Sequence, residues 1–188
     1  MRCLVCRRLS WRYICTACQA ELLRPSVHKR SLLPGFDVVS FYSFDEIEEL
    51  LKAKYALYGN FIYKTIARNS LALFAKNFES EAFVVPIDAR LNKMGFSHTA
   101  VLARAMRTKF LKPRYDALYA SNDISYAGKS LAFRLANPRG FRYTGPVGDV
   151  ILVDDVVTTG TTLKEAYTAV RRAGANPLFA LVLADADR

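Results

Sequence analysis

The chain has 188 residues, of which 52% are hydrophobic and 23% are charged. This length and composition predict one globular domain with room for a small appendage, and they exclude a largely disordered chain. The longest apolar runs are far shorter than the roughly 18 residues that a membrane helix needs, so we predict no membrane span. The first residues lack the pattern of a signal peptide, which predicts a cytoplasmic protein without disulfides.

Basic residues outnumber acidic residues by 27 to 17, and the excess is concentrated in two segments. Residues 1–30 contain seven basic residues and one acid, and residues 90–114 contain seven basic residues and no acid. Each segment is either a footprint for a polyanion or a solvated surface. The polyanion would be nucleic acid or a multiply phosphorylated small molecule.

All the cysteines lie near the N-terminus, in two Cys-x2-Cys pairs with eight residues between them: Cys3, Cys6, Cys15 and Cys18. Two thiolates at this spacing can share one ion, and two such turns complete a tetrahedral site of four sulfur atoms. We therefore predict a structural zinc site, because a module of about 25 residues needs a metal to fold. Iron and a pair of redox motifs are the alternatives. Trp11 and Tyr13, between the pairs, either stack on the bases of a single-stranded nucleic acid or pack the hairpin.

Residues 24–35 are basic and contain two prolines and Gly35, which predicts a linker with a domain boundary near residue 30. The predicted units are residues 1–30, the zinc module with its linker, and residues 31–188. Residues 36–44 predict a strand. A helix capped by Asp45 follows, and a second helix is expected over residues 60–76.

Residues 82–87 are a short apolar run closed by Pro86 and Asp88, which predicts a buried strand that leads into a functional loop. Helical spacing resumes near His98, and residues 125–135 predict a further helix. Residues 150–153 predict a strand, residues 161–172 a helix and residues 178–183 a last strand. This βαβ unit predicts an α/β fold, with a parallel sheet flanked by helices and a ligand at the carboxyl ends of the strands.

The segment over residues 150–162 reads Val-Ile-Leu-Val-Asp-Asp-Val-Val-Thr-Thr-Gly-Thr-Thr. Hydroxyl and N–H groups at a helix N-terminus attract an anion, which predicts a phosphate site at Thr158, Thr159, Gly160, Thr161 and Thr162. Asp154 and Asp155 would repel a phosphate, so they suit sugar hydroxyls or a magnesium shell beside it. The pattern therefore predicts a sugar phosphate as ligand, against the alternative of a helix start that is merely rich in threonine.

These thirteen residues resemble the phosphoribosyl pyrophosphate (PRPP) motif of type I phosphoribosyltransferases. The resemblance implies a type I phosphoribosyltransferase-like fold with a hood over the active site. It also implies that Asp154 and Asp155 bind the ribose hydroxyls and that residues 158–162 bind the 5-phosphate. Because its N-terminal segment contains the four cysteines, the chain is similar to the ComF branch of competence proteins. Further segments support this: Leu51 to Tyr55 with Gly59, Val85-Pro86 with Arg90 and Gly95-Phe96, and Arg134 with Asn137 and Phe141.

The resemblance further implies a pyrophosphate loop over residues 86–93, with Arg90 and Lys93 as charge partners and Lys54 as another anion contact. Magnesium would accompany PRPP. Where the family usually has Asn-Gln, this chain has Ser97 and His98, and we interpret His98 as a packed or capping residue rather than a general base.

Two functions follow, and the sequence leaves open whether turnover occurs. The first is a PRPP-binding, phosphoribosyltransferase-like competence protein that handles single-stranded DNA in the cytoplasm during DNA uptake, with DNA-uptake proteins as partners. The alternative is a phosphoribosyltransferase that acts on a small-molecule base or amine and has no DNA role.

Overall fold

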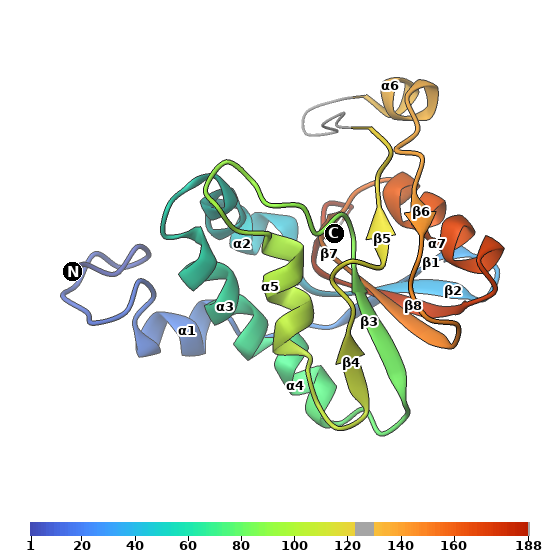
Figure 1. Cartoon of the computed structure of the whole chain (residues 1–188). Helices are drawn as coiled ribbons and strands as arrows, with labels where there is room; N and C mark the ends of the chain where they lie inside the picture. Colours follow the sequence, from blue (N-terminus) through green and yellow to red (C-terminus); the bar gives the residue numbers. More distant parts are fainter. Residues whose placement is uncertain (123–129, 188) are drawn as a thin grey trace.

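The structure is a computed structural model, and it describes residues 1–122 and 130–187 (Figure 1). A six-stranded sheet at its centre has the order β1-β2-β8-β7-β3-β4. Its strands are β1 (His28–Leu33), β2 (Phe36–Ser43), β3 (Ala82–Pro86), β4 (Leu111–Pro113), β7 (Asp149–Val157) and β8 (Asn176–Asp185). β1 pairs with β2 antiparallel, and the other neighbours are parallel. The predicted α/β class, a parallel sheet flanked by helices, is confirmed.

Helices cover both faces of the sheet (Figure 1). The described helices are α1 (Thr16–Leu22), α2 (Phe44–Leu51), η1 (Lys52–Tyr55), α3 (Gly59–Asn69), α4 (Leu71–Lys76), α5 (His98–Ala105), α6 (Leu131–Ala136) and α7 (Thr161–Arg172). Of these, α6 stands away from the sheet (Figure 1). A short antiparallel pair, β5 (Leu118–Tyr119) and β6 (Arg142–Tyr143), stands apart from the main sheet. Within the described ranges, no helix is long and apolar enough to cross a membrane.

The core has two halves because side chains of a strand alternate between the faces of a sheet. In β7, Ile151 and Val153 are buried among the helices α1 to α5, whereas Val150 and Leu152 are buried on the face that carries α7. The cysteine module belongs to the first half, since Cys3 and the other buried side chains of the module pack in the same cluster.

The segment predicted to be a linker contains an edge strand of the sheet. Residues 28–33 form β1, which pairs with β2 from His28↔Ser40 to Leu33↔Phe36. The two residues between these strands are Pro34 and Gly35, and Gly35 has a φ of 75°, as a tight turn requires. The linker prediction was therefore wrong for these residues: the prolines flank the strand and do not interrupt it. The division into residues 1–30 and 31–188 stays a prediction, and residue 30 lies within β1.

Two helices differ from their predicted limits. The helix after β2 begins at Phe44 rather than after Asp45, because Ser43 is the N-cap and its N–H donates to Glu46 Oε2 at 3.0 Å. The predicted helix over residues 60–76 is broken at Ser70 into α3 and α4. The polar side chains at the break compete for backbone carbonyls: Asn69 donates to Thr65 O and Ser70 to Ile66 O, each at 2.8 Å.

The βαβ unit formed by β7, α7 and β8 is confirmed, but β7 is longer than predicted. It continues through both acids to Val157, with Asp154 opposite Val182 of β8. The helix predicted over residues 125–135 lies partly outside the described residues, and the described part forms α6 from Leu131.

Candidate functional site

The strand order creates a crevice between β3 and β7. From β3 the chain crosses through α5 to β4 on one side, and from β7 it crosses through α7 to β8 on the other side. Ligands of such sheets bind outside the carboxyl ends of the strands at this point of reversal. A cavity of about 470 Å³ lies there, lined by Ile87 and Asp88 after β3 and by residues 154–158 and 160–163 at the end of β7.

Asp155 is buried at the base of this cavity, with 9% of its side chain exposed. Its Oδ2 accepts hydrogen bonds from Lys54 Nζ at 2.8 Å and from Tyr63 OH at 3.2 Å, and His98 Nε2 lies 3.6 Å away. Burial raises the pKa of Asp155, but His98, Lys54 and the Tyr63 hydroxyl together lower it below its usual range. Asp155 is therefore ionised in the folded protein.

Asp154 behaves differently although it is adjacent. Its Oδ1 accepts the N–H of Asp155 at 2.9 Å. Burial and the charge of Asp155 raise the pKa of Asp154 well above its usual range. Asp154 thus keeps its proton to a higher pH than Asp155, and the two carboxyl groups titrate as a coupled pair.

The threonine loop follows β7 and begins α7. Gly160 is the N-cap and has a φ of 74°, and a Cβ at this position would lie 2.6 Å from Leu32 Cδ2. The left-handed backbone favours glycine, and a Cβ would also force the Leu32 side chain to move. The Thr159 and Thr161 hydroxyl oxygens lie 2.9 Å apart. The first N–H groups of a helix have no partner within the helix and can bind an anion.

The start of the loop is held by an arginine that sequence analysis did not identify. Arg30, in β1, donates to Thr158 O at 2.7 Å and to both carboxylate oxygens of Asp185 at 3.0 Å. It also donates to Asp187 Oδ2 at 2.8 Å. Because the side chain of Asp185 is only 1% exposed, the guanidinium neutralises a buried charge at the end of β8 and fixes the loop beside it.

Most of the predicted phosphate-site residues line the cavity, but three predicted residues do not. Thr158, Gly160, Thr161, Thr162, the two acids and Lys54 are among its lining residues. Thr159 instead lines a second cavity of about 860 Å³ between α7 and the segment that contains β6. Arg90 and Lys93 are absent from the residues that line the first cavity, and Lys93 is exposed.

His98 and Asn92 line the cavity near Lys54. His98 begins α5 and packs edge-on against the Tyr63 ring, with 5.6 Å between ring centroids. Burial lowers the pKa of His98, although the neighbouring charge of Asp155 opposes the shift. Asn92 donates to Lys54 O at 2.8 Å and accepts from Met94 N, which fastens the loop after β3 to η1.

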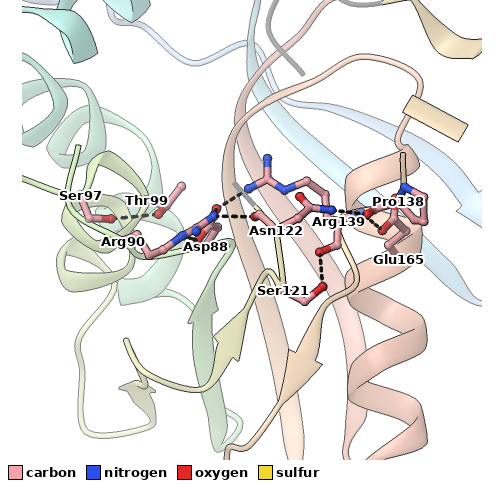
Figure 2. A network of polar contacts seen from close by, with 9 residues as sticks. All are labelled: Asp88, Arg90, Ser97, Thr99, Ser121, Asn122, Pro138, Arg139 and Glu165. Carbon is pink, nitrogen blue, oxygen red and sulfur yellow. Dashed lines mark hydrogen bonds and ion pairs between the residues drawn. The ribbon is translucent and has the colours of Figure 1, made fainter. Parts of the chain in front are cut away.

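A polar network connects the loop after β3 to the segment after α6 (Figure 2). Arg90 donates to Asp88 through Nε at 2.6 Å and Nη2 at 2.7 Å, and Arg139 Nη2 donates to the same carboxylate. Asp88 and Arg139 both line the cavity. No local pattern predicts the pairing of Asp88 with Arg139, since the two residues are 51 positions apart.

The four cysteines form a cluster whose ligand atoms all lie within 4.8 Å of one another, so the cluster can hold a zinc ion. The sulfur atoms of Cys6 and Cys15 are 3.7 Å apart, close to the edge of a tetrahedron with Zn–S bonds of about 2.3 Å. Burial tends to raise the pKa of Cys3, but backbone hydrogen bonds lower it to about 6. Burial and the neighbouring sulfurs raise the pKa of Cys18 to about 12. A cation among the sulfurs would allow all four to ionise.

No family model matches the chain. A curated protein similar to it is the transcriptional regulator GfcR of Haloquadratum walsbyi, with 29% identity over 110 residues. That match covers 56% of this chain, and the chain spans less than half, 45%, of the relative's length.

Solved phosphoribosyltransferases are also similar. The adenine enzyme of Leishmania tarentolae has 17% identity and a TM-score of 0.41, with 92% of this chain and 88% of that chain covered. The hypoxanthine enzyme of Staphylococcus aureus has 17% identity and a TM-score of 0.40, with 65% and 62% covered. The orotate enzyme of Aeropyrum pernix has 18% identity and a TM-score of 0.34, with 90% and 80% covered. Because these TM-scores lie below 0.5, we take neither fold nor substrate from them.

Proposed function

We propose that the protein binds PRPP in the cavity between β3 and β7 and acts as a type I phosphoribosyltransferase-like protein. The observation that carries this proposal is the meeting of two acids and a threonine-lined helix N-terminus in one cavity at the reversal point of a parallel sheet. A phosphate at the start of α7 is favoured by free N–H groups and the helix dipole. Sugar hydroxyls would then donate to the carboxylates of Asp154 and Asp155.

Each residue has a distinct task in this proposal. Asp155 is already ionised and is held by Lys54 and Tyr63, so it accepts a ribose hydroxyl without further reorganisation. Asp154 can accept or donate at its second oxygen according to its protonation. The negative charge of the pair also stabilises positive charge that develops on the sugar as the pyrophosphate leaves.

Magnesium fits the donors present, since carboxylate oxygens are the ligands it prefers and the ligand atoms of His98, Asp154 and Asp155 lie within 4.8 Å of one another. When bound, it would add positive charge beside the pyrophosphate and ribose oxygens. Lys54 supports the same charge balance, because its ammonium group lies against Asp155 and lines the cavity. We expect zinc, by contrast, to be structural, in the closed four-cysteine site.

Calorimetry with PRPP and magnesium tests this proposal. The double variant Asp154→Asn/Asp155→Asn removes the acceptors for the ribose hydroxyls, and we expect it to bind PRPP at least tenfold more weakly. Asp149→Asn is a matched control, because it changes the same charge at the opposite end of β7, where Asp149 accepts from Asn176 Nδ2 at 2.7 Å. Unchanged affinity in the double variant would refute the sugar-site assignment.

A second proposed function is the handling of single-stranded DNA, as in the competence role in DNA uptake. The supporting observation is an aromatic surface of four exposed side chains, Trp11, Tyr55, Tyr58 and Phe61, together with the half-buried Tyr13. Trp11 is 98% exposed and so does not pack the hairpin. The ring of Tyr13 stacks on that of Tyr58, with 5.4 Å between centroids, and Tyr55 lines the cavity. The partial similarity to a protein named as a transcriptional regulator is a weaker support.

Gel retardation of single-stranded DNA at low salt tests this second function. Stacking on an aromatic ring is worth about 1–3 kcal/mol per base, so Trp11→Ala should weaken binding by about fivefold or more. Val147→Ala is the control, because Val147 is 70% exposed and lies outside the aromatic surface. Absence of retardation by the wild-type protein would favour the alternative, a phosphoribosyltransferase for a small-molecule base or amine.

A further inference from the structure

Asp88 pairs with two guanidinium groups, that of Arg139, which lines the proposed PRPP cavity with Asp88, and that of Arg90, which lies in the same loop as Asp88 but does not line the cavity. Asp88 accepts from Arg90 through both carboxylate oxygens and from Arg139 through Oδ2 (Figure 2). The side chains of Asp88 and Arg139 are each 15% exposed, and that of Arg90 is 41% exposed. Two oxygens of a phosphoryl group offer an arginine the same paired contact as a carboxylate does. The carboxylate of Asp88 therefore stands where an anionic ligand group could bind.

The two arginines are positioned by contacts other than Asp88. The backbone N–H of Arg139 donates to Glu165 Oε2 at 2.7 Å, and its carbonyl accepts from Ser121 N at 3.0 Å. Arg90 also donates to Asn122 O at 3.1 Å, and Asn122 Nδ2 donates to Pro138 O. Removal of the Asp88 charge would thus leave the backbone of Arg139 and the guanidinium of Arg90 with their other contacts.

We propose that Asp88 is an internal competitor for the pyrophosphate group: its carboxylate occupies Arg90 and Arg139, and a ligand must displace it to bind there. This inference rests on the proposed function, and it adds Arg139 to the anion site. A carboxylate in this position both blocks and repels an incoming anion. It also makes the site selective, because a pyrophosphate group, with more negative charge than a carboxylate, competes better than a monoanion for the guanidinium groups.

The sign of the effect distinguishes this proposal from an ordinary binding role. Loss of a ligand-binding residue weakens affinity, whereas loss of a competitor strengthens it. Asp88→Asn is the suitable change, because asparagine keeps the shape and tolerates the left-handed backbone at Asp88, where φ is 48°. Asp116→Asn is the matched control, since Asp116 is exposed and is not among the residues that line the cavity.

The experiment is calorimetric titration of inorganic pyrophosphate into the wild-type protein and three variants. We expect Asp88→Asn to bind about tenfold more tightly, equivalent to about 1.4 kcal/mol. Arg139→Gln should bind about tenfold more weakly, and Asp116→Asn should match the wild type. Equal or weaker binding by Asp88→Asn would overturn the proposal. If that variant failed to fold, wild-type affinity in Arg139→Gln would overturn it instead.

The two proposals fail in different ways. The PRPP titration of Asp154→Asn/Asp155→Asn tests the sugar site. The pyrophosphate titrations of Asp88→Asn and Arg139→Gln, made without magnesium, test the competitor role separately, because inorganic pyrophosphate has no ribose. If the PRPP affinity is unchanged when the two acids are replaced, the proposed function fails. If the pyrophosphate affinity is unchanged when Asp88 and Arg139 are replaced, only the competitor role fails.

Discussion

The ion pair between Lys54 and Asp155 gives the sharpest prediction for stability. The ammonium and carboxylate groups are 2.8 Å apart, with side-chain exposures of 24% and 9%. The change Lys54→Met keeps the length of the side chain and leaves Asp155 with Tyr63 and His98 as its neighbours. Breaking a buried pair by removing one partner costs about 3–5 kcal/mol. Because this pair borders a cavity open to water, we expect Lys54→Met to lower the free energy of unfolding by about 2 kcal/mol.

Urea denaturation at pH 7, followed by circular dichroism, measures this loss. Lys52→Met is the matched control, because Lys52 lies two residues away and pairs with Glu48 and Glu49 on the surface. Exposed pairs contribute little, so the control should unfold at nearly the wild-type urea concentration. Equal losses in the two variants would refute the importance of the buried pair.

The pH dependence provides an independent check. The pKa of Asp155 is lower in the folded protein than in the unfolded chain, so its stabilisation is present above the unfolded pKa of about 3.9. That stabilisation is lost as the pH falls through the folded value. The stability difference between wild type and Lys54→Met should therefore be full at pH 6–7 and should shrink below about pH 4. A difference that stayed constant to pH 3 would contradict the electrostatic origin.

Three other predictions concern the supports of the site and the metal. Gly160→Ala should destabilise the protein by about 2 kcal/mol, since it combines a left-handed backbone with a close contact to Leu32. Gly35→Ala is the control, because it has the same left-handed backbone but open space around the new Cβ. Equal shifts in the urea midpoint of the two variants would contradict the packing argument. Arg30→Met should cost about 2–3 kcal/mol because it leaves the buried charge of Asp185 unpaired, and a thermal midpoint equal to wild type would disprove this. Native mass spectrometry should find one zinc ion per chain and none in Cys18→Ser, and a wild-type chain without metal would rule out the structural zinc site.

The local patterns of the sequence predicted the unit that carries the site. The apolar run at residues 150–153, the helical spacing that follows and Gly174 correctly predict β7, α7 and β8. The end of β7 was misjudged, because acids are poor strand formers and only the pairing with β8 keeps Asp154 and Asp155 extended. The cap at Ser43 was predictable, since Ser43 and Glu46 have the spacing of a capping box.

The parts of the candidate site that sequence analysis did not predict are contacts between distant segments. Arg30 reaches Asp185 across 155 positions, and Tyr63 reaches Asp155 across 92. Neither residue type is unusual in its local sequence, so only the strand order brings these groups together. His98 shows the same limit: it packs against Tyr63, as interpreted from the sequence, but it also lines the cavity.

A crystal structure of the protein with PRPP and magnesium tests the central claim most directly. The account predicts the 5-phosphate at the N-terminus of α7, within hydrogen-bond distance of residues 158–162, and the ribose hydroxyls on Asp154 and Asp155. Density for the sugar elsewhere, or an empty cavity between β3 and β7 at saturating PRPP, would contradict it.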